Sequence, residues 1–137
     1  MTARAVRGLL DTSTVILLSR LTEESLPEQP LISAVTLAEL SVGPLVTSDA
    51  REQAARQAEV QQAEAAFDPL PFDAAAARAF ARVAASLRRS GRKSQARTFD
   101  AMIAAVALAN DLPLHTCNPA DFADIDGLEV IAVPHPD

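Results

Sequence analysis

Four acidic residues stand where carboxylates could share a metal ion. Each follows a short apolar run or lies in a helical segment, and the four are Asp11, Glu39, Asp100 and Asp121. Carboxylates gathered in one place repel one another and partly protonate unless a cation offsets their charge. Mg²⁺ and Mn²⁺ prefer carboxylate and water oxygens, and such an ion activates water and neutralises charge on a phosphodiester. The four acids therefore predict a divalent-metal site with hydrolytic chemistry.

An apolar helix and the strand after it must position two of these acids. Residues 98–109 consist of alanines and larger apolar side chains with almost no polar face, which predicts a buried helix with Asp100 in its first turn. Pro113 prevents this helix from continuing. A short strand over residues 114–116 then leads to a loop that carries Asp121. In an open parallel sheet, these two places face one crevice at the carboxyl ends of the strands.

The first acid follows the first strand. An apolar run over residues 6–10 predicts a central strand, and Asp11 lies at its carboxyl tip. A helix over residues 14–21 comes next, with Thr12 or Ser13 as its N-cap. The competing interpretation of Asp11 is that it caps this helix itself.

The second acid lies on the next helix. A short strand at residues 31–32 precedes a helix over residues 33–42, and Glu39 lies on the body of that helix. Thr36 and Glu39 also fit a capping box, in which the glutamate serves only the helix end. The apolar residues begin before Thr36, however, so Ser33 is the better N-cap.

Two more helices occupy the middle of the chain. Residues 49–67 form a polar, alanine-rich and half-exposed helix, and residues 74–89, capped by Asp73, carry an apolar stripe at helical spacing. We expect these two helices to form a hairpin. The last strand covers residues 129–133. The alternation of strands and helices predicts one α/β domain over residues 1–137, with a mainly parallel central sheet.

A cluster of basic residues directly precedes Asp100. It includes Arg92, Lys93 and Arg97. A run of like charges is usually a solvated turn. Its place beside a candidate metal site makes contact with nucleic-acid phosphates a serious alternative.

The composition limits the class of protein. The formal net charge is −6, so the surface as a whole is not a nucleic-acid footprint. The single cysteine excludes an internal disulfide framework and suits a reducing compartment. No apolar run reaches membrane-spanning length, and the first residues lack a signal-peptide pattern. We therefore expect a soluble, cytoplasmic protein.

Four sequence blocks together resemble a known family. They are VRGLLDTS, ISAVTLAEL, FDAMIAAVA and HTCNPADF, and they span nearly the whole chain in the same order as in that family. In these blocks the chain is similar to PIN-domain ribonucleases and, more narrowly, to the VapC toxins of bacterial toxin–antitoxin pairs. The resemblance implies a PIN-like three-layer sandwich with a projecting helical hairpin. It also implies an Mg²⁺- or Mn²⁺-dependent endoribonuclease, usually a homodimer, that a small VapB-type antitoxin inhibits by gripping the helices over residues 49–89.

The same resemblance assigns roles to individual residues. The four acids match the acidic positions of the family, and Ser13 matches its hydroxyl position two residues after the first acid. Thr116 and Asn118 match polar residues that orient the acids and bound water. Asp124 and Asp126 lie near Asp121 but are expected to be exposed loop acids.

Other functions fit the residues less well. A phospho-receiving module would need paired acids after the first strand and a late lysine, and a haloacid-type phosphatase would need an acid where Ser13 stands. Cys117, His115 and His135 have unsuitable spacing for zinc, and Cys117 with His115 makes a weak thiol site. The main alternative to a nuclease is a non-catalytic α/β binding module whose acids hold a structural divalent metal. Metal-dependent cleavage of RNA would discriminate between the two.

Overall fold

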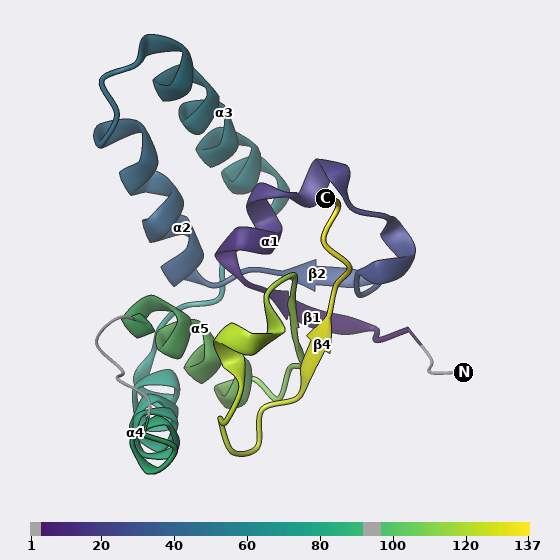
Figure 1. The fold of residues 1–137 in the computed structure, drawn as a ribbon, viewed down its shortest axis with the longest axis vertical. Coiled ribbons are helices and arrows are strands. Elements are labelled where there is room, and N and C mark those ends of the chain that lie inside the picture. The colour runs from purple at the N-terminus through teal and green to yellow at the C-terminus, as the bar shows by residue number, and fades with distance from the viewer. Residues whose placement is uncertain (1–3, 92–96) are drawn as a thin grey trace.

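A parallel β-sheet forms the centre of the fold (Figure 1). Across residues 4–91 and 97–137, which the computed structural model describes, the sheet has four strands in the order β2-β1-β3-β4. They are β1 (Arg7–Leu10), β2 (Gln29–Leu31), β3 (Leu114–Thr116) and β4 (Val130–Ala132). All neighbouring pairs of these strands are parallel, which confirms the predicted sheet. Because β1 and β3 are neighbours, the residues that follow them meet at one edge of the sheet.

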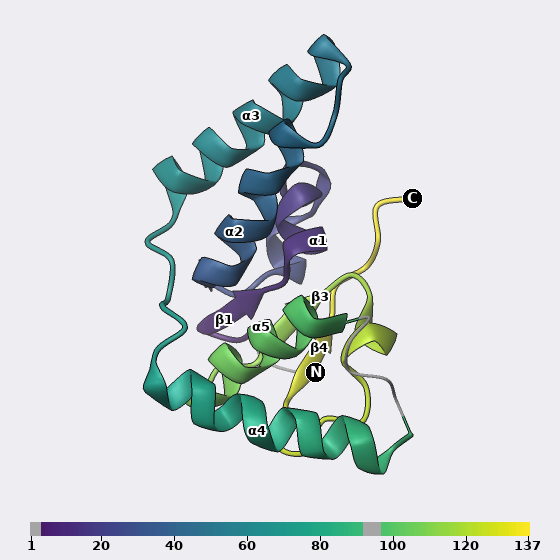
Figure 2. The ribbon, with the colours of Figure 1, turned by 90° about the vertical axis from the view of Figure 1, so that its left-hand side faces the viewer.

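Helices cover both faces of this sheet and make the predicted three-layer arrangement (Figure 2). On one face lies α5 (Thr98–Ala109), with α4 (Ala74–Arg89) packed along it. On the other face, α1 (Thr12–Ile16) and the 3₁₀ helix η1 (Leu18–Arg20) enclose a smaller apolar cluster around Leu10. None of the helices within the described ranges is both long and apolar enough to cross a membrane.

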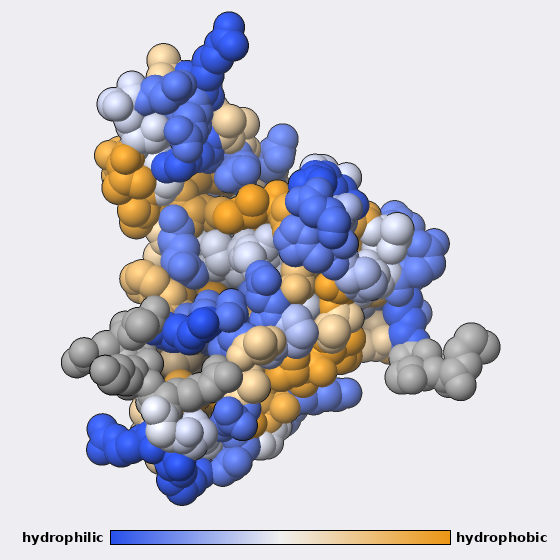
Figure 3. Space-filling view, viewed as in Figure 1, coloured by the Kyte–Doolittle hydropathy of each residue, from blue (hydrophilic) through white to orange (hydrophobic). Residues whose placement is uncertain are grey.

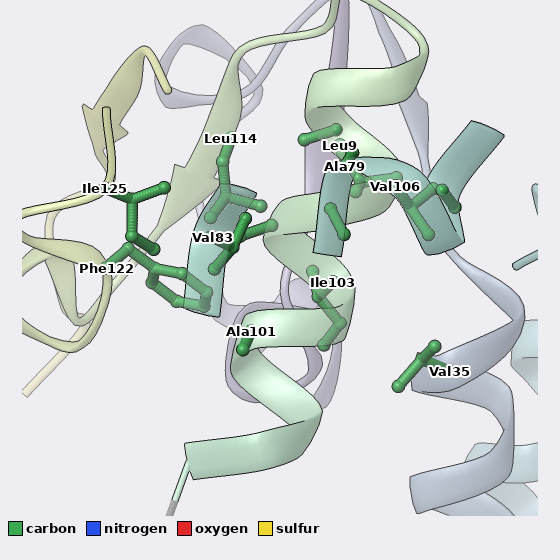
Figure 4. Close-up of a cluster of buried hydrophobic side chains, with 14 of the residues drawn as sticks. Leu9, Val35, Ala79, Val83, Ala101, Ile103, Val106, Leu114, Phe122 and Ile125 are labelled. Carbon is green, nitrogen blue, oxygen red and sulfur yellow. The ribbon is translucent and has the colours of Figure 1, made fainter. Parts of the chain in front are cut away.

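The main hydrophobic core lies between the sheet and the α4–α5 pair (Figure 4). Leu9 and Leu114 from the sheet meet Ile103 and Val106 of α5 and Val83 of α4, and all five side chains are fully buried. Four alanines of α5 are buried as well, and their small side chains let the helix pack against both the sheet and α4; they are Ala101, Ala104, Ala105 and Ala107. The predicted buried helix is confirmed, and its first turn is held at the edge where β1 and β3 end.

The projecting hairpin is made of different helices from those predicted. α2 (Ala34–Val42) and α3 (Ala50–Ala66) pack together through η3 (Gly43–Leu45) and extend away from the sheet (Figure 1). The hairpin predicted over residues 49–89 is therefore wrong, although a projecting hairpin exists.

The apolar side chains of the two middle helices explain this pairing. Val60 and Ala63 of α3 are buried with Leu40 of α2 and with Ile32, in a cluster separate from the main core. α4 instead directs its apolar stripe toward α5, so α3 and α4 lie at opposite ends of the molecule (Figure 2). The pairing thus follows the apolar surfaces available and not the order of the helices along the chain.

Helix ends near the site agree with the predictions in part. Ser33 caps α2 as predicted, because its hydroxyl accepts hydrogen bonds from the N–H groups of Val35 and Thr36. α1 ends at Ile16 and η1 continues the chain, so the helix predicted over residues 14–21 is interrupted. The N-cap of α1 is Asp11, which agrees with the competing interpretation of this residue and not with the predicted cap at Thr12 or Ser13.

Candidate active site

The predicted site residues gather where β1 and β3 end. Asp11 directly follows β1, and Thr116 is the last residue of β3. Asp100 lies in the first turn of α5, and Asp121 lies in the 3₁₀ helix η5 (Pro119–Phe122). Glu39 reaches the same region from α2. The parallel sheet thus collects acids that are far apart in the sequence.

Asp11 is buried and holds four hydrogen bonds. It is 3% exposed. Its Oδ1 accepts from the N–H of Thr14 at 3.3 Å and from the Thr14 hydroxyl. Its Oδ2 accepts from the hydroxyls of Ser13 and Thr116, both at 3.0 Å. Because a carboxylate has about four acceptor positions, protein donors saturate this one. Asp11 therefore caps α1 and belongs to the acidic site at the same time.

The three predicted polar residues form one chain of hydrogen bonds beside Asp11. The Asn118 side-chain amide donates to the Ser13 hydroxyl at 3.0 Å, and the Asn118 N–H donates to the Thr116 hydroxyl at 2.9 Å. Each of these two hydroxyls in turn donates to Asp11. This arrangement fixes the carboxylate between the start of α1 and the loop after β3.

Thr14 is a member of the site that sequence reasoning missed. Its side chain is fully buried, and its hydroxyl also accepts a hydrogen bond from the N–H of Cys117 at 3.0 Å. One hydroxyl therefore joins Asp11 to the backbone that follows β3. A threonine three residues after a helix-capping acid was the available signal, but Thr12 and Ser13 are equally plausible caps by residue type, so the pattern did not single out Thr14.

Glu39 is connected to α1 by a hydroxyl. The Thr12 hydroxyl donates to Glu39 Oε1 at 2.6 Å and lies 3.1 Å from the Thr36 hydroxyl. This contact joins α2 to the residue that follows Asp11. As predicted, Glu39 lies on the body of α2 and takes no part in a capping box.

Arg97 contacts two of the acids directly. Its guanidinium forms an ion pair with Asp121 Oδ1, and its Nη1 lies 3.8 Å from Asp100 Oδ2. Arg97 was predicted to contact nucleic-acid phosphates, and in this structure its guanidinium contacts these two carboxylates instead. The other two predicted phosphate ligands, Arg92 and Lys93, lie outside the described residues.

The four acids share one electrostatic environment. The pKa of Asp100 is raised from 3.8 to about 6, chiefly by burial of its carboxyl group. The negative charges of Asp121, Asp11 and Glu39 raise it further, while Arg97 acts in the opposite direction. Each of the other three predicted acids is thus close enough to influence Asp100.

The donor chemistry fits a hard divalent cation, but two of the acids already have donors from the protein itself. Carboxylates and hydroxyls are the ligands that Mg²⁺ and Mn²⁺ favour. Within residues 4–91 and 97–137, however, no three His, Cys, Asp or Glu side chains lie close enough together to hold one ion. Asp11 is saturated by hydroxyls and a backbone N–H, whereas Asp121 is paired with Arg97 through one oxygen. Metal binding through Asp11, or through that oxygen of Asp121, requires these internal donors to be exchanged.

His115 and Cys117 serve the packing of the sheet. His115 is 2% exposed, and its Nδ1 is buried without a hydrogen-bond partner in the part of the chain that the structure describes. Burial lowers the pKa of His115, so the ring is neutral. A Cβ atom at Gly8 would lie 2.4 Å from this ring, which explains a glycine in the middle of β1. Cys117 is buried in the apolar cluster around Leu10.

Comparisons with known proteins agree with this fold and site. The sequence matches the PIN domain family over residues 6–128. It is 38% identical to "Ribonuclease VapC5" of Mycobacterium tuberculosis, over 97% of this chain and 100% of that protein. It is 30% identical to "Ribonuclease VapC1" of Rickettsia felis, over 94% of this chain and 98% of that one. A crystal structure of the toxin–antitoxin system VapBC-5 from Mycobacterium tuberculosis contains a similar chain, with a TM-score of 0.82 and 39% identity, covering 93% of this chain and 99% of that chain.

Proposed function

The chain belongs to the PIN-domain family, and we propose from this that it is a metal-dependent endoribonuclease toxin held inactive by a cognate antitoxin. It hydrolyses phosphodiester bonds of RNA. The observation that carries the proposal is the gathering of four acids at the carboxyl ends of β1 and β3, in a chain that matches named VapC ribonucleases along almost its whole length.

We assign the metal ligands to the four acids, Asp11, Glu39, Asp100 and Asp121. The ion is Mg²⁺ or Mn²⁺, and when bound it supplies charge neutralisation at the phosphate and activation of water. Ser13, Thr116 and Asn118 orient the carboxylates, and their hydrogen bonds around Asp11 support this role. A carboxylate of the site takes the proton that the attacking water loses.

Basic residues beside the site hold the substrate. We propose that Arg92, Lys93 and Arg97 contact RNA phosphates on either side of the bond that is cut. The Arg97 side chain is 45% exposed and lies beside Asp100 and Asp121, and this position next to the proposed metal ligands supports the role. With a net charge of −6 the protein has little general affinity for RNA, so selectivity depends on RNA shape and unpaired bases.

An apolar groove supports a VapB-type antitoxin as partner. The groove has a volume of about 210 Å³ and lies between α1–η1 and the α2–α3 hairpin, with Val15, Leu18, Leu40 and Phe67 among its lining residues. Figure 3 shows apolar surface over the hairpin on this side of the molecule. Leu45 and Val46, in the connection between α2 and α3, are 82% and 68% exposed. Exposed apolar surface of this kind marks an interaction site.

The assembly and location follow the same proposal. The antitoxin covers the groove beside α2–α3, in place of the residue 49–89 hairpin expected from the sequence. The toxin acts as a homodimer in the cytoplasm, where its RNA substrate lies. The 137 residues form a single PIN-like domain in each subunit.

The proposal is tested with purified protein freed of its partner. We expect it to cut RNA in the presence of Mg²⁺ or Mn²⁺, to stop in EDTA, and to resume when metal is restored. Glu39→Gln is the matched inactive variant, because it keeps the shape of a side chain on the body of α2 while removing one charge. Full cleavage in EDTA would refute the metal site. Metal binding without any cleavage would instead support the non-catalytic binding module.

A further inference from the structure

Arg97 occupies an unusual position for an arginine. It is the N-cap residue of α5, and its side chain makes no capping hydrogen bond. By contrast, α1, α2, α3 and α4 are capped by Asp11, Ser33, Asp49 and Asp73, each through its side chain. A cation at the start of a helix is also opposed by the helix dipole. The capping of α5 therefore does not explain this residue.

The contacts of Arg97 point to a different role. Its guanidinium pairs with Asp121 of η5 and lies 3.8 Å from Asp100 of α5, so it bridges two elements of the site. Within the described residues, no other lysine or arginine pairs with any of the four acids. The guanidinium thus supplies positive charge to two of the four neighbouring carboxylates when no metal is bound.

We propose that Arg97 is a resident counter-cation that holds the metal-free site together and is displaced from Asp121 and Asp100 when the divalent ion binds. The inference rests on the metal site of the proposed function. An arginine and a metal ion compete for the same oxygens, and like charges held at one place repel each other. Arg97 therefore lowers the metal affinity of the free protein. Once displaced, its guanidinium is free to meet an RNA phosphate.

The test is a calorimetric titration of the whole, partner-free protein with Mn²⁺. We expect Arg97→Gln to bind Mn²⁺ about fivefold more tightly than the parent. This factor is the affinity change that corresponds to the free energy of a strong ion pair between exposed side chains. Arg97→Lys keeps the charge and should bind near the parent value. Arg82→Gln is the matched control, since Arg82 is an exposed arginine of α4 with no ion pair in the described residues.

A second measurement separates this role from a purely structural one. Without metal, Arg97→Gln should melt at a lower temperature than the parent, and saturation with Mn²⁺ should close that gap. Equal or weaker Mn²⁺ binding by Arg97→Gln would overturn the inference. Binding of Mn²⁺ by none of the proteins would overturn it together with the metal site. Arg97-dependent Mn²⁺ binding by a protein that never cuts RNA would keep the inference and refute the nuclease.

Discussion

Replacing Asp100 by asparagine should remove activity and stabilise the metal-free protein. The asparagine keeps the shape of the side chain and loses its charge. The pKa of Asp100 is raised from 3.8 to about 6, so the ionised carboxyl costs the folded state up to about 3 kcal/mol at neutral pH. Two effects reduce the gain. The side chain is 29% exposed, so solvent screens part of the repulsion, and an acid in the first turn of a helix contributes about 0.3–1 kcal/mol.

The net expectation is a gain of about 1–2 kcal/mol, or roughly 5 °C in Tm, for Asp100→Asn in EDTA at pH 7.5. The gain should depend on pH in a defined direction. A carboxyl whose pKa is raised by folding binds its proton more tightly in the folded state, so the parent gains stability as pH falls through about 6. The asparagine variant lacks this term. Its advantage should therefore be complete above pH 6, shrink as pH falls below 6, and vanish below 3.8.

Thermal melting in EDTA at several pH values measures this prediction, alongside an RNA cleavage assay with metal. Asp68→Asn is the matched control, because Asp68 is an exposed acid in the connection between α3 and α4. The control should show neither the gain in stability nor the loss of cleavage. An Asp100→Asn variant that melts below the parent at pH 7.5, or whose advantage grows as pH falls, would refute the electrostatic reasoning. Cleavage at the parent rate would remove Asp100 from the site.

Three further substitutions test the surroundings of the site. Thr14→Val keeps the shape of the side chain but removes the hydroxyl that joins Asp11 to the N–H of Cys117. Chemical denaturation should show that the free energy of unfolding falls by about 1–3 kcal/mol, and a fall below about 0.5 kcal/mol would contradict that role. Gly8→Ala should cost about 1–3 kcal/mol or more in the same assay, because its Cβ would lie 2.4 Å from the His115 ring; an unchanged midpoint would show that the ring moves freely. Burial lowers the pKa of His115, so folding favours its neutral form. In urea titrations, the stability of the parent relative to His115→Asn should therefore fall as pH drops below 6.5. A stability difference between the two proteins that stays constant with pH would exclude this cause.

Local residue patterns were sufficient to predict most elements of this fold. The apolar, alanine-rich run over residues 98–109 and the proline that follows it predicted α5 and its end, because both signals act within the helix itself. Ser33 was predicted as the cap of α2 for the same reason. The predicted parallel sheet then indicated that acids after its strands would meet at one edge, and in the structure Asp11, Glu39 and Asp121 each lie close enough to raise the pKa of Asp100.

Long-range pairing was not predictable from those patterns. The apolar stripe of α4 indicated that the helix packs on something, but periodicity does not say which partner it meets, and α5 proved to be that partner. The charge of Arg97 likewise indicated an anion nearby, and the anion in the free protein is a pair of carboxylates. The two interpretations of Asp11 hold together, because one oxygen caps α1 while the other accepts from Ser13 and Thr116, and sequence patterns alone do not show that one carboxylate can do both.

The hydrogen bond between Asp11 and Thr116 joins residues that are 105 positions apart. A chain emerging from the ribosome presents its first strand early, but it acquires the Thr116 support and Asp121 only after β3 has been made. Contacts of such long sequence separation form late, because the intervening chain must first be ordered. Under the proposed assignment of Asp121 as a metal ligand, a nascent chain that still lacks β3 and Asp121 has an incomplete site. We then expect RNA cleavage to begin only after β3 has paired with β1, when the helices that line the apolar groove beside α2–α3 have already been synthesised.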